Sequence, residues 1–468
     1  MKYKSTRGGV SGLSFQDALY TGYAADGGIL VPESIPVLDM ETLRSWSSLS
    51  YIDLAKKIVP LFVDEHEIPA SDLNDLLDKA FAKFTHQEIA PIQRLKNGLN
   101  IMELFHGTTW AFKDLALSCV GQFLEYFLSK QKKHLTIVVG TSGDTGSAAI
   151  EAVKGFEYVD IIVLLPKGRC SKVQEQQMIT AVEKNVHVYR VEGTSDDLDI
   201  PIKEIFKDVA FTKKHNLSSI NSINWSRIMV QIVHYIYGYL QMCPRCDGEV
   251  EIIVPTGACG NVTSGFIAKL MGVPIKFVCA VTQNDIVARA ITKGDYSMSD
   301  RVIPTLAPAM DIQIPYNMER LWYLITQDSE LICKLMTEFE SNGKVDIPTF
   351  LKNQIKEIIV ASYVADNEDI KTTMRRTWEE NQYQICPHTA IGVAYYNSTL
   401  KSDNQRTSVV IATASVKKFE EAVVAAGLTP QKYEEVEVLF TRPVKYTDMN
   451  KGENWELILR DKIEEIDR

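Results

Sequence analysis

Residues 105–114 read Phe105-His106-Gly107-Thr108-Thr109-Trp110-Ala111-Phe112-Lys113-Asp114 and join a predicted strand to a predicted helix. Residues 99–104 have the pattern of a strand. The following segment repeats apolar residues at helical spacing, from Leu117 to Leu128. A lysine at such a junction can lie out of bulk water at the carboxyl edge of a sheet, where α/β proteins bind ligands. There Lys113 can act as nucleophile or base. A random lysine in this position is more often a solvated residue of the first helical turn. Whether Lys113 is reactive therefore depends on what the other segments of the chain contain.

Composition narrows the class of protein. The chain has 468 residues, of which 45% are hydrophobic and 24% charged, so it can form large cores in about two to four domains. Its net charge is −10 and it has no long run of lysine or arginine. We therefore expect neither nucleic acid nor a membrane surface as a partner.

Targeting and metal-binding signals are weak. The first residues lack the apolar core of a signal peptide. The most apolar stretch, residues 228–242, is interrupted by Gln231, His234 and Gln241, which favours a buried helix over a membrane span. Of the eight cysteines, Cys243 and Cys246 form the one close pair, and no second pair completes a zinc site. We expect an intracellular, cytoplasmic protein with reduced thiols and no metal.

Strands, glycine-bearing loops and helices alternate from about residue 100. Short apolar runs predict strands at 135–139, 159–165, 250–254, 275–281 and 408–412. Such runs between helices are typical of parallel sheets covered on both faces. The predicted fold class is therefore α/β, with more than one sheet. Further helices are predicted at 51–62, 73–84 and 455–466, and a possible edge strand at 433–440.

Two of the loops have the chemistry of anion sites. Residues 256–261 follow a strand and open a helix, where small residues let backbone N–H groups and the helix dipole meet a phosphate. A turn tightened for packing is an equally good interpretation. Residues 141–147 combine hydroxyls with a helix start, which suits a carboxylate or phosphate. Asp144 is awkward beside an anion, so we expect it to cap the helix or hold the loop; plain N-capping remains an alternative for the whole loop.

Three other segments offer weaker signals. Residues 221–227 place amides, hydroxyls and the forked donor Arg227 before an apolar helix, which suits oxyanion recognition, although most arginines are surface residues. Thr413 ends a strand with a neutral hydroxyl. His388 is more readily interpreted as structural than as catalytic.

Together these motifs closely resemble the threonine synthase family, fold-type II enzymes that use pyridoxal 5'-phosphate (PLP). The resemblance runs from Ser5-Thr6-Arg7-Gly8 to Lys418-Phe419 and includes Thr-Ser-Gly-Asp-Thr-Gly at 141–146 and Asn-Ser-Ile-Asn-Trp at 221–225. It implies a tryptophan synthase β-like fold with two parallel-sheet lobes. The implied domains are an N-terminal region (1–95), a PLP-binding core (96–425) and a covering segment (426–468). Within the core, a carboxylate-binding lobe spans about 130–215 and a cofactor-phosphate lobe about 220–425.

The resemblance also implies residue roles. Lys113 bonds to PLP and then moves the Cα proton, Phe112 packs against the cofactor ring, and Thr413 faces the pyridine nitrogen. The implied phosphate loop consists of Gly257, Ala258, Cys259, Gly260 and Asn261. Ser142, Gly143, Asp144 and Thr145 are expected around the substrate carboxylate. Candidates for the substrate phosphate are Asn221, Ser222, Arg227 and Lys418.

The chain departs from the family pattern at several places. The family's Gly-x-Phe-Asp-Asp-Cys-Gln is replaced at residues 193–199, which end in Asp199, and its Pro-Ser-Asn becomes Pro315-Tyr316-Asn317. Its Asp-Pro-His becomes Cys386-Pro387-His388, and its Ala-His-Pro-Ala-Lys-Phe is altered at residues 414–419. The cofactor motifs are kept, whereas positions expected to shape substrate or water access have changed.

The synthase-like branch of the family implies a phospho-lyase. Such an enzyme eliminates phosphate from O-phosphohomoserine or O-phosphothreonine and yields 2-oxobutyrate and ammonia. The alternatives are a genuine threonine synthase and, from another class, a binding or signalling protein that keeps the fold without catalysis. A small phosphorylated amino acid is the expected partner, and a homodimer is possible.

Overall fold

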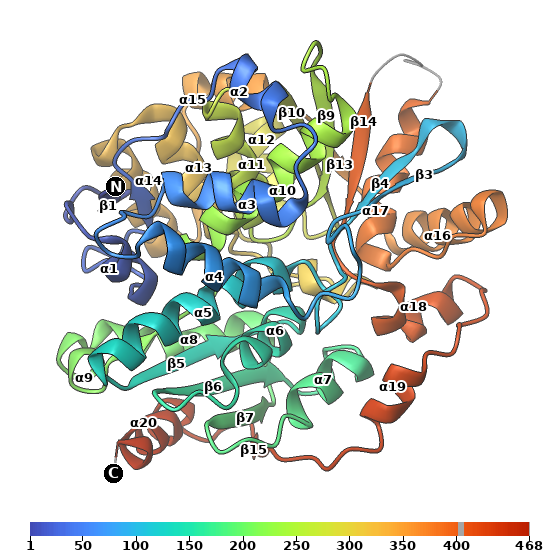
Figure 1. The fold of residues 1–468 in the computed structure, drawn as a ribbon. Coiled ribbons are helices and arrows are strands. Elements are labelled where there is room, and N and C mark those ends of the chain that lie inside the picture. Colours follow the sequence, from blue (N-terminus) through green and yellow to red (C-terminus); the bar gives the residue numbers. More distant parts are fainter. Residues whose placement is uncertain (401–406, 468) are drawn as a thin grey trace.

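Two large sheets form separate halves of the molecule in the computed structural model, which describes residues 1–400 and 407–467 (Figure 1). The six-stranded sheet has the order β13-β10-β9-β14-β4-β3, and the five-stranded sheet the order β15-β7-β6-β5-β8. All neighbours in both sheets are parallel except the pair β3 and β4. The predicted α/β class with more than one parallel sheet is confirmed.

Most strands coincide with the apolar runs of the sequence. The six-stranded sheet contains β3 (Ile92–Arg94), β4 (Asn100–Glu103), β9 (Val250–Pro255), β10 (Ile275–Val281), β13 (Ile359–Val364) and β14 (Ser408–Ala412). The five-stranded sheet contains β5 (Leu135–Gly140), β6 (Val159–Pro166), β7 (Val186–Val191), β8 (Leu217–Ser218) and β15 (Thr447–Met449). Two small antiparallel pairs are β1 (Tyr3–Ser5) with β2 (Leu30–Pro32) and β11 (Asp295–Ser297) with β12 (Lys344–Asp346). The division of the chain at residues 95 and 425 stays a prediction.

Helices cover both sheets and fill the space between them (Figure 1). In the first half of the chain they are α1 (Phe15–Tyr20), α2 (Met40–Ser45), α3 (Tyr51–Ile58), α4 (Ala70–Phe81), α5 (Lys113–Gln131), α6 (Asp144–Val153), α7 (Lys172–Ile179), α8 (Ser195–Lys207), α9 (Val209–Lys214) and α10 (Trp225–Met242). In the second half they are α11 (Gly260–Leu270), α12 (Ile286–Lys293), α13 (Asn317–Thr326), α14 (Ser329–Asn342), α15 (Thr349–Ile358), α16 (Asn367–Asn381), α17 (Pro387–Thr399), α18 (Glu420–Ala425), α19 (Glu434–Leu439) and α20 (Trp455–Ile466).

Helices α5 and α10 form the centre of the main core. Almost every side chain of α10 is buried, including Arg227 and His234. The N-terminal helices α3 and α4 pack against α10 and α5, respectively. The apolar stretch at 228–242 is thus a buried helix, as predicted. In the part of the chain described, no helix is long and apolar enough to cross a bilayer.

The prediction of an edge strand at 433–440 is wrong. These residues form helix α19, whose first turn contains Glu434, Glu435 and Glu437. Acidic side chains there interact favourably with the helix dipole, which outweighs the strand preference of the interspersed valines. The edge of the five-stranded sheet is instead β15, which pairs in parallel with β7.

The sheet order brings the candidate site segments together. Strands β9, β14 and β4 are neighbours in the six-stranded sheet, so the segments that follow them meet at one carboxyl edge. These segments are the 256–261 loop, Thr413 and the 105–113 stretch. In the other sheet, the neighbours β5 and β8 place the 141–145 loop beside residues 219–222.

Candidate active site

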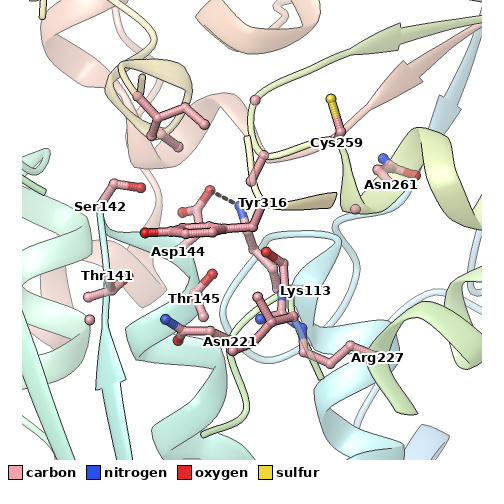
Figure 2. Close-up of a pocket in the computed structure, with 18 of the residues that line it drawn as sticks. Lys113, Thr141, Ser142, Asp144, Thr145, Asn221, Arg227, Cys259, Asn261 and Tyr316 are labelled. Carbon is pink, nitrogen blue, oxygen red and sulfur yellow. Dashed lines mark ion pairs between the residues drawn. The ribbon is translucent and has the colours of Figure 1, made fainter. Parts of the chain in front are cut away.

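A cavity of about 190 Å³ contains nearly all of the candidate residues. Figure 2 shows Lys113 between the loop with Ser142 and the loop with Cys259 and Asn261. The predicted site residues that line the cavity are Phe112, Lys113, Ser142, Asp144, Thr145, Asn221, Ser222, Arg227, Gly257, Ala258, Cys259, Gly260, Asn261 and Thr413. Gly143 belongs to the loop but does not line the cavity. Lys418 lies behind Asp144, fully buried.

Backbone hydrogen bonds to the end of β14 fix the position of Lys113. The Phe112 N–H donates to the Thr413 carbonyl at 2.8 Å, and the Ser415 N–H donates to the Trp110 carbonyl at 3.0 Å. Lys113 directly follows Phe112, so these backbone bonds bring its amine and the Thr413 hydroxyl into the same cavity.

Asp114 holds the loop that precedes the lysine. Its carboxylate accepts hydrogen bonds from the Thr109 N–H at 2.8 Å and from the Thr109 hydroxyl at 2.6 Å. A Cβ on Gly107 would lie 2.4 Å from the Asp114 Cβ, so the loop needs glycine there. Burial raises the pKa of Asp114 to about 6, although the bonds from Thr109 act in the opposite direction.

This raised pKa predicts a pH-dependent stability. An unfolded aspartate titrates near about 3.9, so at pH 7 burial of the Asp114 charge costs free energy that disappears as the pH falls through about 6 toward 4. Asp114→Asn keeps the shape but cannot titrate. We expect the free energy of unfolding of the wild type, relative to Asp114→Asn, to rise by about 2 kcal/mol between pH 7 and pH 4. Urea titrations at both pH values measure it, and an unchanged difference would contradict a raised pKa.

Lys113 has a carboxylate within reach. Its Nζ lies 3.6 Å from Asp144 Oδ2, the ion pair drawn in Figure 2. Burial lowers the pKa of Lys113, which the charge of Asp144 partly offsets. Asp144 Oδ1 lies 2.7 Å from Lys418 Nζ and accepts from Gln174 Nε2 at 2.8 Å. Burial alone would raise the pKa of Asp144, but the charges of Lys418 and Lys113 outweigh it and hold the pKa well below its usual range.

These contacts settle the two interpretations of Asp144. The N-cap residue of α6 is Gly143, which makes no side-chain cap, and Asp144 is the first residue of the helix, so capping by Asp144 is wrong. The loop is held instead by the Asp144 ion pairs and by the Thr141 hydroxyl, which accepts from the N–H groups of Gly143 at 3.0 Å and Gly146 at 2.9 Å. Gly143 has φ 139°, and a Cβ there would lie 2.6 Å from Gln174. Thr141 takes the Gly146 N–H, and the other N–H groups at the start of α6 remain suited to an anion.

The 256–261 loop has the form of a phosphate site. Cys259 has φ 62° and directs the chain into α11, a helix whose first turn no side chain caps. Asn261 Oδ1 accepts from His234 Nε2 at 2.9 Å and from the Tyr235 hydroxyl at 2.8 Å. The Asn261 Nδ2 group is buried without a partner among the described residues, although it lines the cavity. An anion there would satisfy both this amide and the helix N-terminus.

Further buried polar atoms of the cavity have no hydrogen-bond partner within residues 1–400 and 407–467. They are Asn221 Oδ1, Arg227 Nε, Gln231 Oε1 and both ring nitrogens of His388. Arg227 is anchored by its bond to the Ile220 carbonyl at 2.9 Å. Unpaired buried groups are costly, so their accumulation in one cavity indicates a polar ligand. The residues present therefore fit a phosphorylated cofactor.

Several residues that line the cavity were not among the site residues predicted from the sequence. His388 was interpreted as structural, yet it lines the cavity, and burial lowers its pKa to about 4, so it is neutral at pH 7. From the sequence, Gln231 is noted only as a polar residue that interrupts the apolar stretch 228–242, not as a site residue. Arg227, Gln231 and His234 are spaced i, i+4, i+7 on one face of α10, and this polar stripe in an apolar helix could have been recognised. Asp199, Lys203 and Tyr316 also line the cavity.

No group of three or more histidine, cysteine, aspartate or glutamate side chains in the described ranges could hold a metal ion.

Family models match most of the chain. The model described as "Threonine synthase N terminus" matches residues 2–81, "Pyridoxal-phosphate dependent enzyme" matches residues 88–340, and "Threonine synthase, C-terminal" matches residues 389–459.

Named relatives agree with these models. The chain is 51% identical to Threonine synthase-like 2 of Homo sapiens, with 100% of this chain and 98% of the relative covered. It is 39% identical to the threonine synthase of Schizosaccharomyces pombe, with 90% and 88% covered. Among solved structures, PLP-bound threonine synthase from Brucella melitensis has a TM-score of 0.91 at 36% identity, with both chains fully covered. Threonine synthase from yeast has a TM-score of 0.90 at 35% identity, with 99% of this chain and 98% of that chain covered.

Proposed function

We propose, from the premise that the chain belongs to the threonine synthase family of pyridoxal-phosphate-dependent enzymes, that it is a phospho-lyase. Its substrates would be O-phosphohomoserine, O-phosphothreonine or both. Each is converted with one water into 2-oxobutyrate, ammonia and inorganic phosphate. The C–O bond to phosphate breaks, and hydrolysis of the remaining enamine releases the nitrogen, so no oxidant or reductant is needed.

The observation that carries the proposal is the mixed composition of the cavity. Its cofactor side keeps the family pattern: Lys113, the 256–261 loop and Thr413. Its opposite side contains Asp199 and Tyr316, two positions where the chain departs from that pattern. Elimination needs the first set. Threonine synthesis needs, in addition, a water delivered to Cβ, and this step depends on the residues around the substrate side chain.

PLP, when bound, withdraws electrons from the substrate Cα and so makes its proton acidic. The Lys113 amine, with its pKa lowered by burial, is suited to bond to the cofactor and to take that proton. N–H groups at the start of α11 and the Asn261 amide would hold the cofactor phosphate. The neutral Thr413 hydroxyl would face the pyridine nitrogen without forcing its protonation. Ser142, Thr145 and the start of α6 would bind the substrate carboxylate.

Product analysis tests the proposal. We expect the purified protein to release 2-oxobutyrate and phosphate in equal amounts from O-phosphohomoserine or O-phosphothreonine, with threonine a minor product. Lactate dehydrogenase-coupled detection, a phosphate assay and amino-acid chromatography measure the three products. Threonine as the main product from O-phosphohomoserine would refute the lyase.

A genuine threonine synthase is the second candidate. It is supported by the likeness to solved threonine synthases over the full chain. The amino-acid chromatogram distinguishes the two candidates, because threonine is the main product of a synthase and a minor product of a lyase. A non-catalytic protein would turn over neither compound, and the largely buried Lys113 beside Asp144 argues against it.

A further inference from the structure

Two cavity residues from opposite walls are joined by a hydrogen bond. The Tyr316 hydroxyl donates to Asp199 Oδ2 at 2.7 Å. Asp199 lies on α8, which packs against β5 and β6 of the five-stranded sheet. Tyr316 precedes α13, whose first residue, Asn317, donates its N–H to the Ala258 carbonyl in the phosphate loop at 3.2 Å. The bond therefore links the two halves of the molecule across the cavity; we call it the Tyr316–Asp199 bridge.

Neighbouring groups surround the bridge on both sides. A Cβ on Gly140, just before the carboxylate loop, would lie 3.0 Å from Asp199 Oδ1. The Lys203 ammonium lies 4.8 Å from the centroid of the Tyr316 ring, and the Tyr23 ring meets it edge-on at 6.3 Å. In Figure 2 the Tyr316 hydroxyl points toward the side that carries Thr141 and Ser142. The ring is thus a fixed part of the wall.

Both members of the bridge stand where the family pattern has a different residue. The pattern has glutamine at the position of Asp199 and serine at the position of Tyr316. A serine side chain is too short to reach Asp199, and it would leave the volume of the phenol ring open. The bridge depends on both differences, and together they make the cavity smaller and add a negative charge.

We propose that the Tyr316–Asp199 bridge determines substrate choice, favouring an amino acid with its phosphate on Cβ over one with its phosphate on Cγ. The inference rests on the proposed function. With the substrate carboxylate at the 141–145 loop and Cα near Lys113, the side chain must extend into the rest of a small cavity. A phosphate on Cγ lies one bond farther from Cα than a phosphate on Cβ, so its dianion comes closer to the Tyr316 ring and the Asp199 carboxylate, where volume and like charge oppose it.

The test is the ratio of kcat/KM for O-phosphothreonine to that for O-phosphohomoserine. The two substrates are isomers that differ in the carbon bearing the phosphate, and a one-bond displacement of a group in a shaped pocket is worth about tenfold or more, so Tyr316→Ser is expected to shift this ratio at least tenfold toward O-phosphohomoserine. Tyr316→Phe keeps the ring and releases the bond, so its shift is smaller. In the double variant Tyr316→Phe/Asp199→Asn, the change in the logarithm of this ratio should be smaller than the sum of the changes in the two single variants, because the two side chains act as a unit.

Controls separate this inference from folding and from the proposed function. The ratio compares two substrates on one preparation, so the folded fraction cancels. Tyr446→Phe removes a phenolic hydroxyl outside the cavity and should leave the ratio unchanged. The ratio of dissociation constants is also measured in the Lys113→Ala background, from changes in cofactor absorbance. If the wild type turns over neither compound, the proposed function fails, and this binding ratio still tests the bridge. The proposal fails if the substrate ratio of Tyr316→Ser lies within about threefold of the wild-type ratio. The ratio compared is that of kcat/KM or, where neither compound is turned over, that of the dissociation constants.

Discussion

Lys113→Ala is expected to lower turnover of either phosphorylated substrate at least about a thousandfold, because it removes the group that takes the Cα proton. The cofactor should still bind noncovalently. The start of α11 and the Asn261 amide, which form the proposed phosphate site, are untouched by the substitution. Stopped assays of 2-oxobutyrate and the absorbance of gel-filtered protein measure the two properties separately.

Lys130→Ala is the matched control for this substitution. Lys130 lies on the same helix, α5, but is exposed and pairs with Asp72 at 3.5 Å on the surface. The control should leave both turnover and cofactor content at wild-type levels. Turnover of Lys113→Ala within about tenfold of the wild type would exclude Lys113 as the base.

Asp144→Ala is expected to destabilise the protein by about 3–5 kcal/mol. The substitution leaves the ammonium of Lys418, which is fully buried, without the carboxylate that lies 2.7 Å from it. It also deprives Lys113 of its nearby negative charge. Urea unfolding of the cofactor-free protein measures the loss.

A second substitution distinguishes a lost charge pair from lost packing. In Asp144→Ala/Lys418→Met no buried charge is left unpaired, and we expect at least half of the lost stability to return. Asp448→Ala removes an ion pair with Arg190 at the partly exposed edge of the sheet, where such pairs are worth about 0–1 kcal/mol. If the double variant is no more stable than Asp144→Ala, the ion pair does not explain the effect.

The position of Lys113 could be predicted because it depends on a local pattern. A strand, a short loop of small residues and an amphipathic helix follow each other within 99–131, and the structure reproduces this order in β4 and α5. The loops at 256–261 and 141–147, whose residues line the same cavity, were predicted in the same way, each from a strand, a glycine-bearing turn and a helix start. Periodicity and turn chemistry are properties of neighbouring residues.

The role of Lys418 could not be found in this way. In the sequence it was a candidate for the substrate phosphate, whereas in the structure it neutralises Asp144 from behind the cavity wall. The partners are separated by 274 positions, 418 minus 144, and no local pattern relates them. Residues 433–440 show that the type of a short element can also escape prediction. A segment that mixes glutamate and valine suits a strand or a helix, and the surrounding structure determines that it forms helix α19.

The sequence by itself determined the α/β class, most of the strands and helices, and the strand-loop-helix segments that contain Lys113 and the two candidate anion loops, because these follow from the spacing of apolar, small and polar residues along the chain. The tertiary structure decided which of them meet. Sheet order places the ends of β9, β14 and β4 side by side, and the packing of α8 and α13 brings Asp199 to Tyr316. These contacts join residues far apart in the chain, so they depend on the burial of whole sheets and helices, a property that no single segment encodes.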